Sequence, residues 1–134
     1  MGENISLKSL SPSYYTRISE VKKRIQKRGR LLDAGCSDGY LDYLIKDKRL
    51  KIFGVDINET DIQIAKELNP ENRYLVCDIT KMPFKSNYFD TIVCIDVLEH
   101  LENDEKAIRE ITRVLKEGGK AILTVPLLGL PFHI

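Results

Sequence analysis

Four aspartates stand at the ends of four short apolar segments of this 134-residue chain: Asp33, Asp56, Asp78 and Asp96. A carboxylate in such a position can accept hydrogen bonds from both hydroxyls of a ribose, or from the exocyclic amine of a purine. Any one of these acids could instead be a helix cap or a turn former. Three of them in succession, from Asp33 to Asp78, favour a site for an adenosine-like ligand.

The first aspartate opens a turn of small residues, Asp-Ala-Gly-Cys-Ser-Asp-Gly, at positions 33–39. Gly35, Ser37 and Gly39 allow the backbone to turn sharply and to approach a ligand closely. A helix that is predicted to begin near Tyr40 would point its free N–H groups and the positive end of its dipole at the same place. The turn therefore suits a carboxylate or a phosphate group.

Two other interpretations of this turn fit it less well. The dinucleotide pattern G-x-G-x-x-G needs glycine at positions 35, 37 and 40, and only Gly35 is present, which disfavours a nicotinamide or flavin cofactor. The turn also spells G-x-S-x-G, the nucleophile elbow of α/β-hydrolases, with Ser37 as nucleophile and His133 as a later base. A hydrolase elbow follows several strands and a loop that supplies an oxyanion-hole N–H, whereas this turn follows the first predicted strand.

Alternating apolar and amphipathic segments must position these residues. The predicted strands are 31–34, 52–56, 74–77, 91–95 and 121–125, and the predicted helices between them are 40–46, 60–68 and 104–116. Such alternation predicts an α/β fold with a mostly parallel sheet, helices on both faces and right-handed crossovers. In an open sheet of this kind the ligand lies beyond the carboxyl ends of the strands, where the aspartates stand.

Residues 1–29 are predicted to form an N-terminal helical region ahead of a core at 30–134, and both belong to a single domain. Ser11 and Pro12 are typical of a helix start, and apolar residues then recur every three or four positions until Gly29. The other face of this helix is basic, with Arg17, Lys22, Lys23, Arg24, Lys27 and Arg28. This face could meet an anionic substrate or RNA, or it could be a solvated face.

Composition excludes several classes of protein. Apolar residues make up 43% and charged residues 31%, which is typical of a globular domain and excludes a disordered chain. The net charge is +1, so no overall field draws the chain to nucleic acid or to a membrane, and both are disfavoured as partners. Cys36, Cys77 and Cys94 form no C-x-x-C pair, which indicates neither a zinc site nor a disulfide framework and favours the reducing cytoplasm. No apolar stretch reaches the ~20 residues that cross a bilayer, and the N-terminus lacks the pattern of a signal peptide.

The motifs between residues 31 and 126 resemble those of the class I S-adenosylmethionine-dependent methyltransferases, in the branch called methyltransferase type 11. The acid-x-Gly-x-Gly-x-Gly turn of that family is matched at 33–39, with Ser37 in place of the middle glycine. Further matches lie at 53–57, 77–79, 82–84, 89–101 and 113–119. The resemblance implies a three-layer Rossmann-like sandwich with strand order 3-2-1-4-5 that lacks the final antiparallel strands of the family.

The resemblance also implies that the chain binds S-adenosylmethionine and releases S-adenosylhomocysteine. Asp33, Gly35 and the carbonyl of Asp96 would lie near the methionine amino group. Asp56 would bind the ribose and Asp78 the edge of the purine. The implied cofactor-binding set is Asp33, Gly35, Cys36, Ser37, Gly39, Asp56, Ile57, Asp78, Ile79, Met82, Asp96 and Val97.

Within this set, Ile57 and Met82 would enclose the purine, and the N–H of Ile79 would bind its edge. The resemblance implies no metal. If the methyl acceptor is a hydroxyl or an amine, Glu99 and His100 are candidates for the base that takes its proton. A histidine at a helix start could equally be a capping or packing residue.

The implied activity is methyl transfer to an O, N, S or C nucleophile, with a small molecule as the expected acceptor. The alternative is a non-catalytic cofactor-binding module that needs a partner. The family's sheet continues past the fifth strand, whereas this chain ends nine residues after Val125. We therefore expect either a truncated copy or a fifth strand covered by a second copy or another chain, because a bare apolar edge invites pairing.

Overall fold

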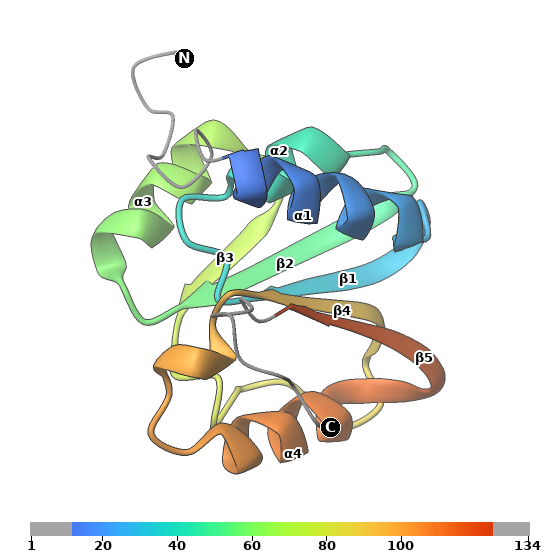
Figure 1. The fold of residues 1–134 in the computed structure, drawn as a ribbon. Helices are drawn as coiled ribbons and strands as arrows, with labels where there is room; N and C mark the ends of the chain where they lie inside the picture. The colour runs from blue at the N-terminus through green and yellow to red at the C-terminus, as the bar shows by residue number, and fades with distance from the viewer. Residues whose placement is uncertain (1–11, 125–134) are drawn as a thin grey trace.

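Five parallel strands form one sheet in the order β3-β2-β1-β4-β5 (Figure 1). The structure is a computed structural model that describes residues 12–124. The strands are β1 (Gly29–Ala34), β2 (Leu50–Asp56), β3 (Arg73–Val76), β4 (Phe89–Ile95) and β5 (Leu115–Thr124). The helices are α1 (Pro12–Arg24), α2 (Tyr40–Ile45), α3 (Glu59–Leu68), α4 (Asp104–Val114) and the short 3₁₀ helix η3 (Leu98–His100). This architecture and strand order confirm the predicted fold.

Helices cover both faces of the sheet: α1, α2 and α3 lie on one face and α4 lies on the other (Figure 1). The alternation of side chains along β1 explains how both faces are buried. Leu31 packs in a cluster with α1 and α2, whereas its neighbour Leu32 packs in a cluster with α4. Ile18 and Val21 of α1 are 3% and 2% exposed in the first of these clusters, so the N-terminal helix is part of the core.

The parallel arrangement gives the sheet two chemically different edges. All five strands end at one edge, which we call the carboxyl edge, and all begin at the other, the amino edge. In the register of β1 and β2, Ala34 lies opposite Val55. The turn that follows β1 therefore lies beside Asp56, the last residue of β2.

The N-terminal helix ends at Arg24, before the stop that was predicted at Gly29. Gly29 is instead the first residue of β1, with a φ of 90°. A Cβ at this position would lie 2.6 Å from Asp90 Oδ2, which accepts a hydrogen bond from the N–H of Arg30 at 2.8 Å. Glycine is needed at the start of β1 because a side chain would be strained at this φ and would collide with Asp90.

The boundary between α4 and β5 also differs from the prediction, which placed a helix at 104–116 and a strand at 121–125. α4 ends at Val114 and β5 begins at the next residue, Leu115. The glycines at 118 and 119 therefore lie within the strand. Leu115 pairs with Phe89 and Lys120 pairs with Thr91, so a longer stretch of β5 bulges opposite a short stretch of β4. Gly118 has a φ of 79°, which this bulge requires. The predicted last residue of the strand, 125, lies outside the described residues.

The other boundaries lie within two residues of their predicted positions. The helix η3 was not predicted, because three residues carry too little periodic pattern to detect. None of the helices within residues 12–124 has the length and apolar character that a bilayer crossing needs.

Candidate functional site

Carboxylates line the carboxyl edge of the sheet. Asp33 lies near the end of β1, Asp56 is the last residue of β2, and Asp96 directly follows β4. Asp33 and Asp96 are 3% and 6% exposed, and Asp56 is half-buried. The structure thus brings these three residues to one edge, around the turn that follows β1.

This turn, at 35–39, is held between β2 and the loop after β4. The N–H groups of Gly35 and Cys36 both donate to the carbonyl of Val55, at 2.8 and 2.9 Å. Gly35 has a φ of 81°, and a Cβ there would collide with the side chain of Val97. Gly39 has a φ of 80°. Both glycines are required, because other residues rarely adopt these backbone angles.

Ser37, which replaces the middle glycine of the family pattern, also has a left-handed backbone, with a φ of 53°. Such a conformation costs a residue with a side chain roughly 1–2 kcal/mol. The N–H of Ser37 donates to Asp56 Oδ2 at 2.9 Å and so ties the turn to the end of β2. The serine therefore keeps the glycine-like backbone that lets a ligand approach closely.

Asp56 is hydrogen-bonded to the protein and still has capacity for a ligand. Its Oδ2 accepts from the N–H of Ser37 and its Oδ1 from the N–H of Asn58, both at 2.9 Å. Each carboxylate oxygen has two lone pairs, so each can accept one further hydrogen bond, as from a ribose hydroxyl. Ile57, the next residue, is 72% exposed and offers an apolar surface beside this carboxylate.

The segment after β3 carries the residues that the sequence predicts to bind the purine. Asp78 is exposed, and its Oδ1 accepts hydrogen bonds from the N–H and the Oγ1 of Thr80, which lower the pKa of Asp78. Ile79 and Met82 are only 5% and 4% exposed and pack in the core cluster on the α4 side. The side chain of Met82 therefore lies in the core, whereas that of Ile57 is exposed.

Helix α1 adds a cation to the acidic edge. Arg17 donates from Nε and Nη2 to Asp96 Oδ2, at 3.1 and 2.7 Å. Tyr14, one turn earlier, is half-buried near the same edge, and burial together with the nearby carboxylates raises the pKa of its phenol. Sequence reasoning placed Arg17 on the basic face of the helix and missed this contact. The spacing of Arg17 from the inward-facing Tyr14 and Val21, one turn away on either side, was the signal that could have found it.

Tyr14 also lies over the turn. A hollow of about 20 Å³ separates them, lined in part by Asp33, Ser37 and Ile95. This space holds about one water molecule. An amino-acid arm that binds on this turn would therefore require the Tyr14 end of α1 to move aside.

A buried polar network supports the turn from beneath. Tyr74 Oη donates to Asp42 Oδ2 at 2.8 Å, and Asn69 Nδ2 donates to the carbonyl of Gly39 at 2.9 Å and to Tyr74 Oη at 3.0 Å. Asp42 and Asn69 are fully buried. Sequence reasoning did not find this network, because its members come from α2, from the end of α3 and from β3, and no local pattern pairs them.

Asp42 lies close to Asp33, and Asp42 Oδ1 is buried with no other hydrogen-bond partner among residues 12–124. Two carboxyl groups can share a hydrogen bond only when one of them carries a proton. Burial, followed by the charge of Asp33, raises the pKa of Asp42 well above its ordinary value. Asp42 is therefore the member of the pair that burial makes harder to ionise.

The two candidate bases lie on η3, directly after the β4 loop. His100 Nε2 lies 3.4 Å from Glu99 Oε1, and the His100 side chain is 76% exposed. The cap of α4 is Asn103, and its side chain accepts a hydrogen bond from the backbone of the first turn of α4 at 3.0 Å. His100 is thus not the cap of α4, and both candidates can exchange protons with solvent.

The cysteines are structural. All three are free, and burial raises the pKa of Cys77 to about 11 and that of Cys94 to about 12. Burial raises the pKa of Cys36 as well. A cysteine nucleophile must be a thiolate, which these environments disfavour. Cys36 is 5% exposed, so the part of it that can face a ligand at the turn is its backbone.

Comparison with known families decides between the interpretations of this edge. Residues 32–123, more than half of the chain, match the family model described as a methyltransferase domain. The chain belongs to the methyltransferase domain family. The hydrolase and dinucleotide interpretations of the turn are thereby set aside, and the family confirms S-adenosylmethionine as the cofactor.

Curated relatives of this methyltransferase domain carry names with different acceptors. The chain is 31% identical over 114 residues to tRNA (carboxymethyluridine(34)-5-O)-methyltransferase alkbh8 of Xenopus tropicalis. This alignment covers 83% of this chain and 18% of the relative. The chain is 32% identical over 127 residues to sterol 4-C-methyltransferase strm-1 of Caenorhabditis elegans. That alignment covers 90% of this chain and 38% of the relative. The methyltransferase domain described here thus spans less than half the length of these relatives.

A solved structure shows the same fold. The TehB-like SAM-dependent methyltransferase of Corynebacterium glutamicum superimposes with a TM-score of 0.69 and is 27% identical. The match covers 79% of this chain and 59% of that chain. The fold of this methyltransferase is therefore that of an established S-adenosylmethionine-dependent relative.

Proposed function

We propose that this methyltransferase binds S-adenosylmethionine at the carboxyl edge of its sheet and transfers the methyl group to an O, N, S or C nucleophile of a small molecule. One observation carries the proposal: three buried or half-buried carboxylates surround a turn with positive φ at three positions. Such a turn allows close approach of a ligand, and the carboxylates suit a ligand with hydroxyls and a cationic amino group. Membership of the family supports the assignment.

Each part of the edge has a separate binding task in this proposal. Asp33 supplies negative charge and the carbonyl of Asp96 supplies an acceptor where the methionine amino group lies, while the Asp96 side chain stays paired with Arg17. Asp56 accepts hydrogen bonds from the ribose through its remaining lone pairs, and Ile57 covers the nucleoside. Asp78 remains the exposed acceptor that can bind the edge of the purine.

The chain's own residues mainly orient S-adenosylmethionine and the methyl acceptor relative to each other. When bound, S-adenosylmethionine supplies a methyl group that is already activated by a cationic sulfur. Holding two reactants in a productive geometry can supply roughly 7–11 kcal/mol of the barrier. Tyr14 and Arg17 on α1 can close over the methionine end and exclude water. Where the acceptor is a hydroxyl or an amine, Glu99 or His100 takes its proton and passes it to solvent.

A small molecule is the acceptor class that we propose, and the named relatives show how wide the choice is within the family. The sterol methyltransferase aligns over 90% of this chain, and a ubiquinone biosynthesis O-methyltransferase of Coxiella burnetii aligns over 78%. Both names describe small organic acceptors. We also propose the cytoplasm as the location, because three free cysteines suit a reducing compartment.

Calorimetric titration tests the cofactor site. S-adenosylhomocysteine should bind the wild-type chain, and Asp56→Ala should weaken binding at least 100-fold, because two hydrogen bonds to a charged group are lost. Asp104→Ala is the matched control: it removes an exposed carboxylate from the first turn of α4 and should change the affinity less than about twofold. Saturation by NAD with no response to S-adenosylmethionine or S-adenosylhomocysteine would contradict the assignment.

A second candidate is a cofactor-binding module without activity of its own, which acts with another chain. The observation that favours it is an exposed strand at one edge of the sheet that residues 12–124 form. β5 is an edge strand with Leu123 41% exposed, so a partner chain or a second copy could pair with it. Transfer of a labelled methyl group to any acceptor in a metabolite extract supports the enzyme, and tight cofactor binding without transfer supports the module.

A further inference from the structure

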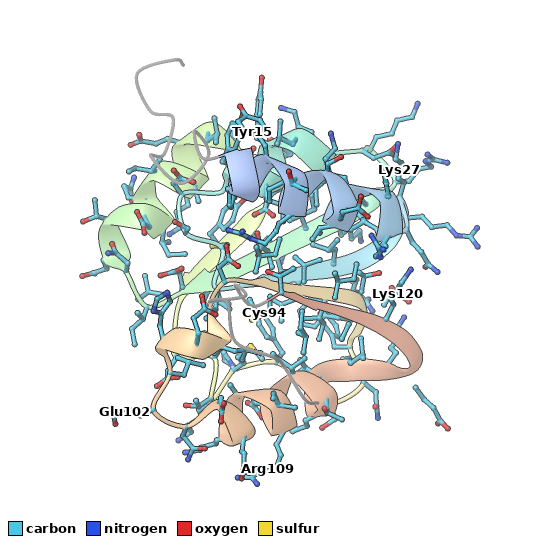
Figure 2. All side chains as sticks on the ribbon, in the orientation of Figure 1. Tyr15, Lys27, Cys94, Glu102, Arg109 and Lys120 are labelled. Atoms are coloured by element: carbon cyan, nitrogen blue, oxygen red, sulfur yellow. The ribbon has the colours of Figure 1, made fainter. Side chains whose placement is uncertain are left out.

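The charges of the molecule are segregated between the two edges of the sheet. The carboxyl edge carries the aspartates of the candidate site, whereas lysines and arginines gather where the strands begin. Figure 2 shows Lys27 and Lys120 on that side of the molecule, near the end of α1 and the start of β5. A net charge of +1 conceals this separation, because opposite charges on distant surfaces cancel in the sum.

Two adjoining hollows lie on this basic side. The larger has a volume of about 610 Å³ and is lined by five cations against two acids. These cations are Arg30, Lys46, Lys48, Lys51 and Arg73. The smaller, of about 290 Å³, lies between the end of α1 and the end of α2.

The smaller hollow adds Lys22, Lys23 and Lys27 and shares Lys46 and Asp47 with the larger one, so the two hollows adjoin. We call this surface the basic track. Its members are Lys22, Lys23, Lys27, Arg30, Lys46, Lys48, Lys51 and Arg73. A row of cations along two adjoining hollows suits a linear polyanion better than a single small anion.

Most of these cations lack a carboxylate partner. Among residues 12–124, Lys23 is the one member of the basic track with a carboxylate oxygen within 4 Å, that of Glu20 at 3.3 Å. Asp47, one of the two acids of the larger hollow, is instead paired with Arg49 at 3.1 Å. The positive charge of the track is therefore only weakly compensated by the protein itself.

The apolar residues that line the basic track, such as Leu44, Leu50 and Ile52, are buried or half-buried. The exposed large apolar side chains of the described chain are Tyr15, Ile57, Leu75, Val76, Ile108 and Leu123. None of them lines either hollow. Stable protein interfaces depend on such anchors in buried pockets, whereas a phosphate backbone is bound mainly by lysine and arginine. The one tyrosine that lines the track, Tyr88, already has Arg30 stacked 4.2 Å from its ring centre, so it does not offer that face to a base.

We propose that the basic track binds the phosphodiester backbone of a single-stranded nucleic acid, without reading its bases. A flexible strand can follow hollows that pass from the amino ends of the strands to the end of α1. The inference does not depend on the proposed methyl transfer. The seven residues of β2 separate the two edges by about 20 Å, which exceeds the screening length of about 10 Å at 0.1 M salt.

Fluorescence anisotropy with a labelled oligouridylate of about 12 nucleotides tests the proposal on the full chain. We expect binding at about 50 mM salt that weakens as salt is raised. The double variant Lys46→Glu/Lys51→Glu should weaken binding at least tenfold. It should also make the slope of log affinity against log salt shallower by about 1.4, because about 0.7 is lost per phosphate contact on a single strand.

The matched control is Lys66→Glu/Lys106→Glu, which makes the same change of charge at exposed positions on α3 and α4. It should leave the affinity within about threefold, since neither lysine lines either hollow. Binding of S-adenosylhomocysteine in a separate titration shows that each variant is folded. This folding control is independent of the oligonucleotide measurement. The proposal is overturned if the oligonucleotide does not bind at about 50 mM salt or if both double variants weaken binding equally. It is also overturned if poly-glutamate binds more tightly than the oligonucleotide, which would identify an acidic protein as the occupant.

Discussion

Ser37 holds backbone angles that favour glycine, and the strain of this conformation is local to one residue. Ser37→Gly should therefore stabilise the chain by about 1 kcal/mol, after allowance for the extra freedom of glycine in the unfolded state. The reverse exchange, Gly35→Ser, should destabilise it by more, because its side chain would also collide with Val97. Urea denaturation of both variants measures the two effects. A loss of stability in Ser37→Gly would show that its side chain matters more than its backbone.

The proton on Asp42 makes stability depend on pH. The folded chain keeps this proton at pH values where the unfolded chain, with an ordinary pKa of 3.8, has lost it. The contribution is fully present below pH 3.8 and is lost as pH rises towards the raised pKa of the folded state. Tyr74 and Asn69 face this group and stay neutral near pH 7, whereas Asp33 and Asp38 add negative charge nearby that disfavours ionisation of Asp42.

Asp42→Asn should remove this dependence. The asparagine side chain can donate to Asp33 and accept from Tyr74, as the protonated carboxyl does. The variant should gain stability relative to wild type as pH rises from 4 to 8, by at most about 1.4 kcal/mol per pH unit. Asp47→Asn is the control: hydrogen bonds from Arg49 lower the pKa of Asp47 to about 2, so its contribution is lost only below about pH 4 and this variant should show no change relative to wild type between pH 4 and 8. Equal stability of Asp42→Asn and wild type at every pH would mean that Asp42 carries no buried proton.

At the scale of elements, one buried ion pair fastens α1 over the carboxyl edge. Asp96 is 6% exposed and is paired with Arg17, whereas the Arg24–Glu20 pair of the same helix is exposed. A buried carboxylate that loses its partner is costly, and an exposed pair contributes little. The contact that holds α1 on the sheet therefore lies in the first half of the helix, near the site. The last turn of α1 lies beside the basic track.

Arg17→Ala should consequently destabilise the chain by about 1–3 kcal/mol, because it leaves Asp96 without its charged partner. Arg24→Ala should change stability by less than about 0.5 kcal/mol. Thermal denaturation at neutral pH compares the two variants directly. Similar effects of both substitutions would show that the Arg17–Asp96 pair does not fasten the helix.

The elements themselves were largely predictable, and the exceptions have physical causes. Apolar runs bounded by glycines and acids located every strand, because strands buried on both faces need such runs. The end of α4 was predicted too late, because Leu115 fits a helical repeat but pairs with Phe89 across the bulge. Gly29 was taken for a helix stop, although the contact that requires it, with Asp90, is distant in the sequence. Tertiary contacts decided these boundaries where local propensity left a choice.

On the scale of the whole molecule, the parallel sheet separates two kinds of chemistry. Acids gather where the strands end and bases gather where they begin, so each edge can attract a ligand of opposite charge. A cationic cofactor on one edge and a polyanion on the other would not compete for the same residues. The sequence-based prediction that nucleic acid is disfavoured used only the net charge of the chain. The net charge is near zero because the negative charge of the carboxyl edge cancels the positive charge of the amino edge.

The sequence by itself determined the fold class, the strand order through its family resemblance, and the turn and aspartates of the candidate site. These follow from local patterns, because strand period, small residues in a turn and an acid after a strand are readable within a few positions. Only the tertiary structure decided that Met82 faces the core, that Arg17 reaches Asp96, and that Asp42 is buried close to Asp33. Each of these depends on which side chains meet across elements and on how much water remains between them, and neither quantity is encoded in a local window of sequence.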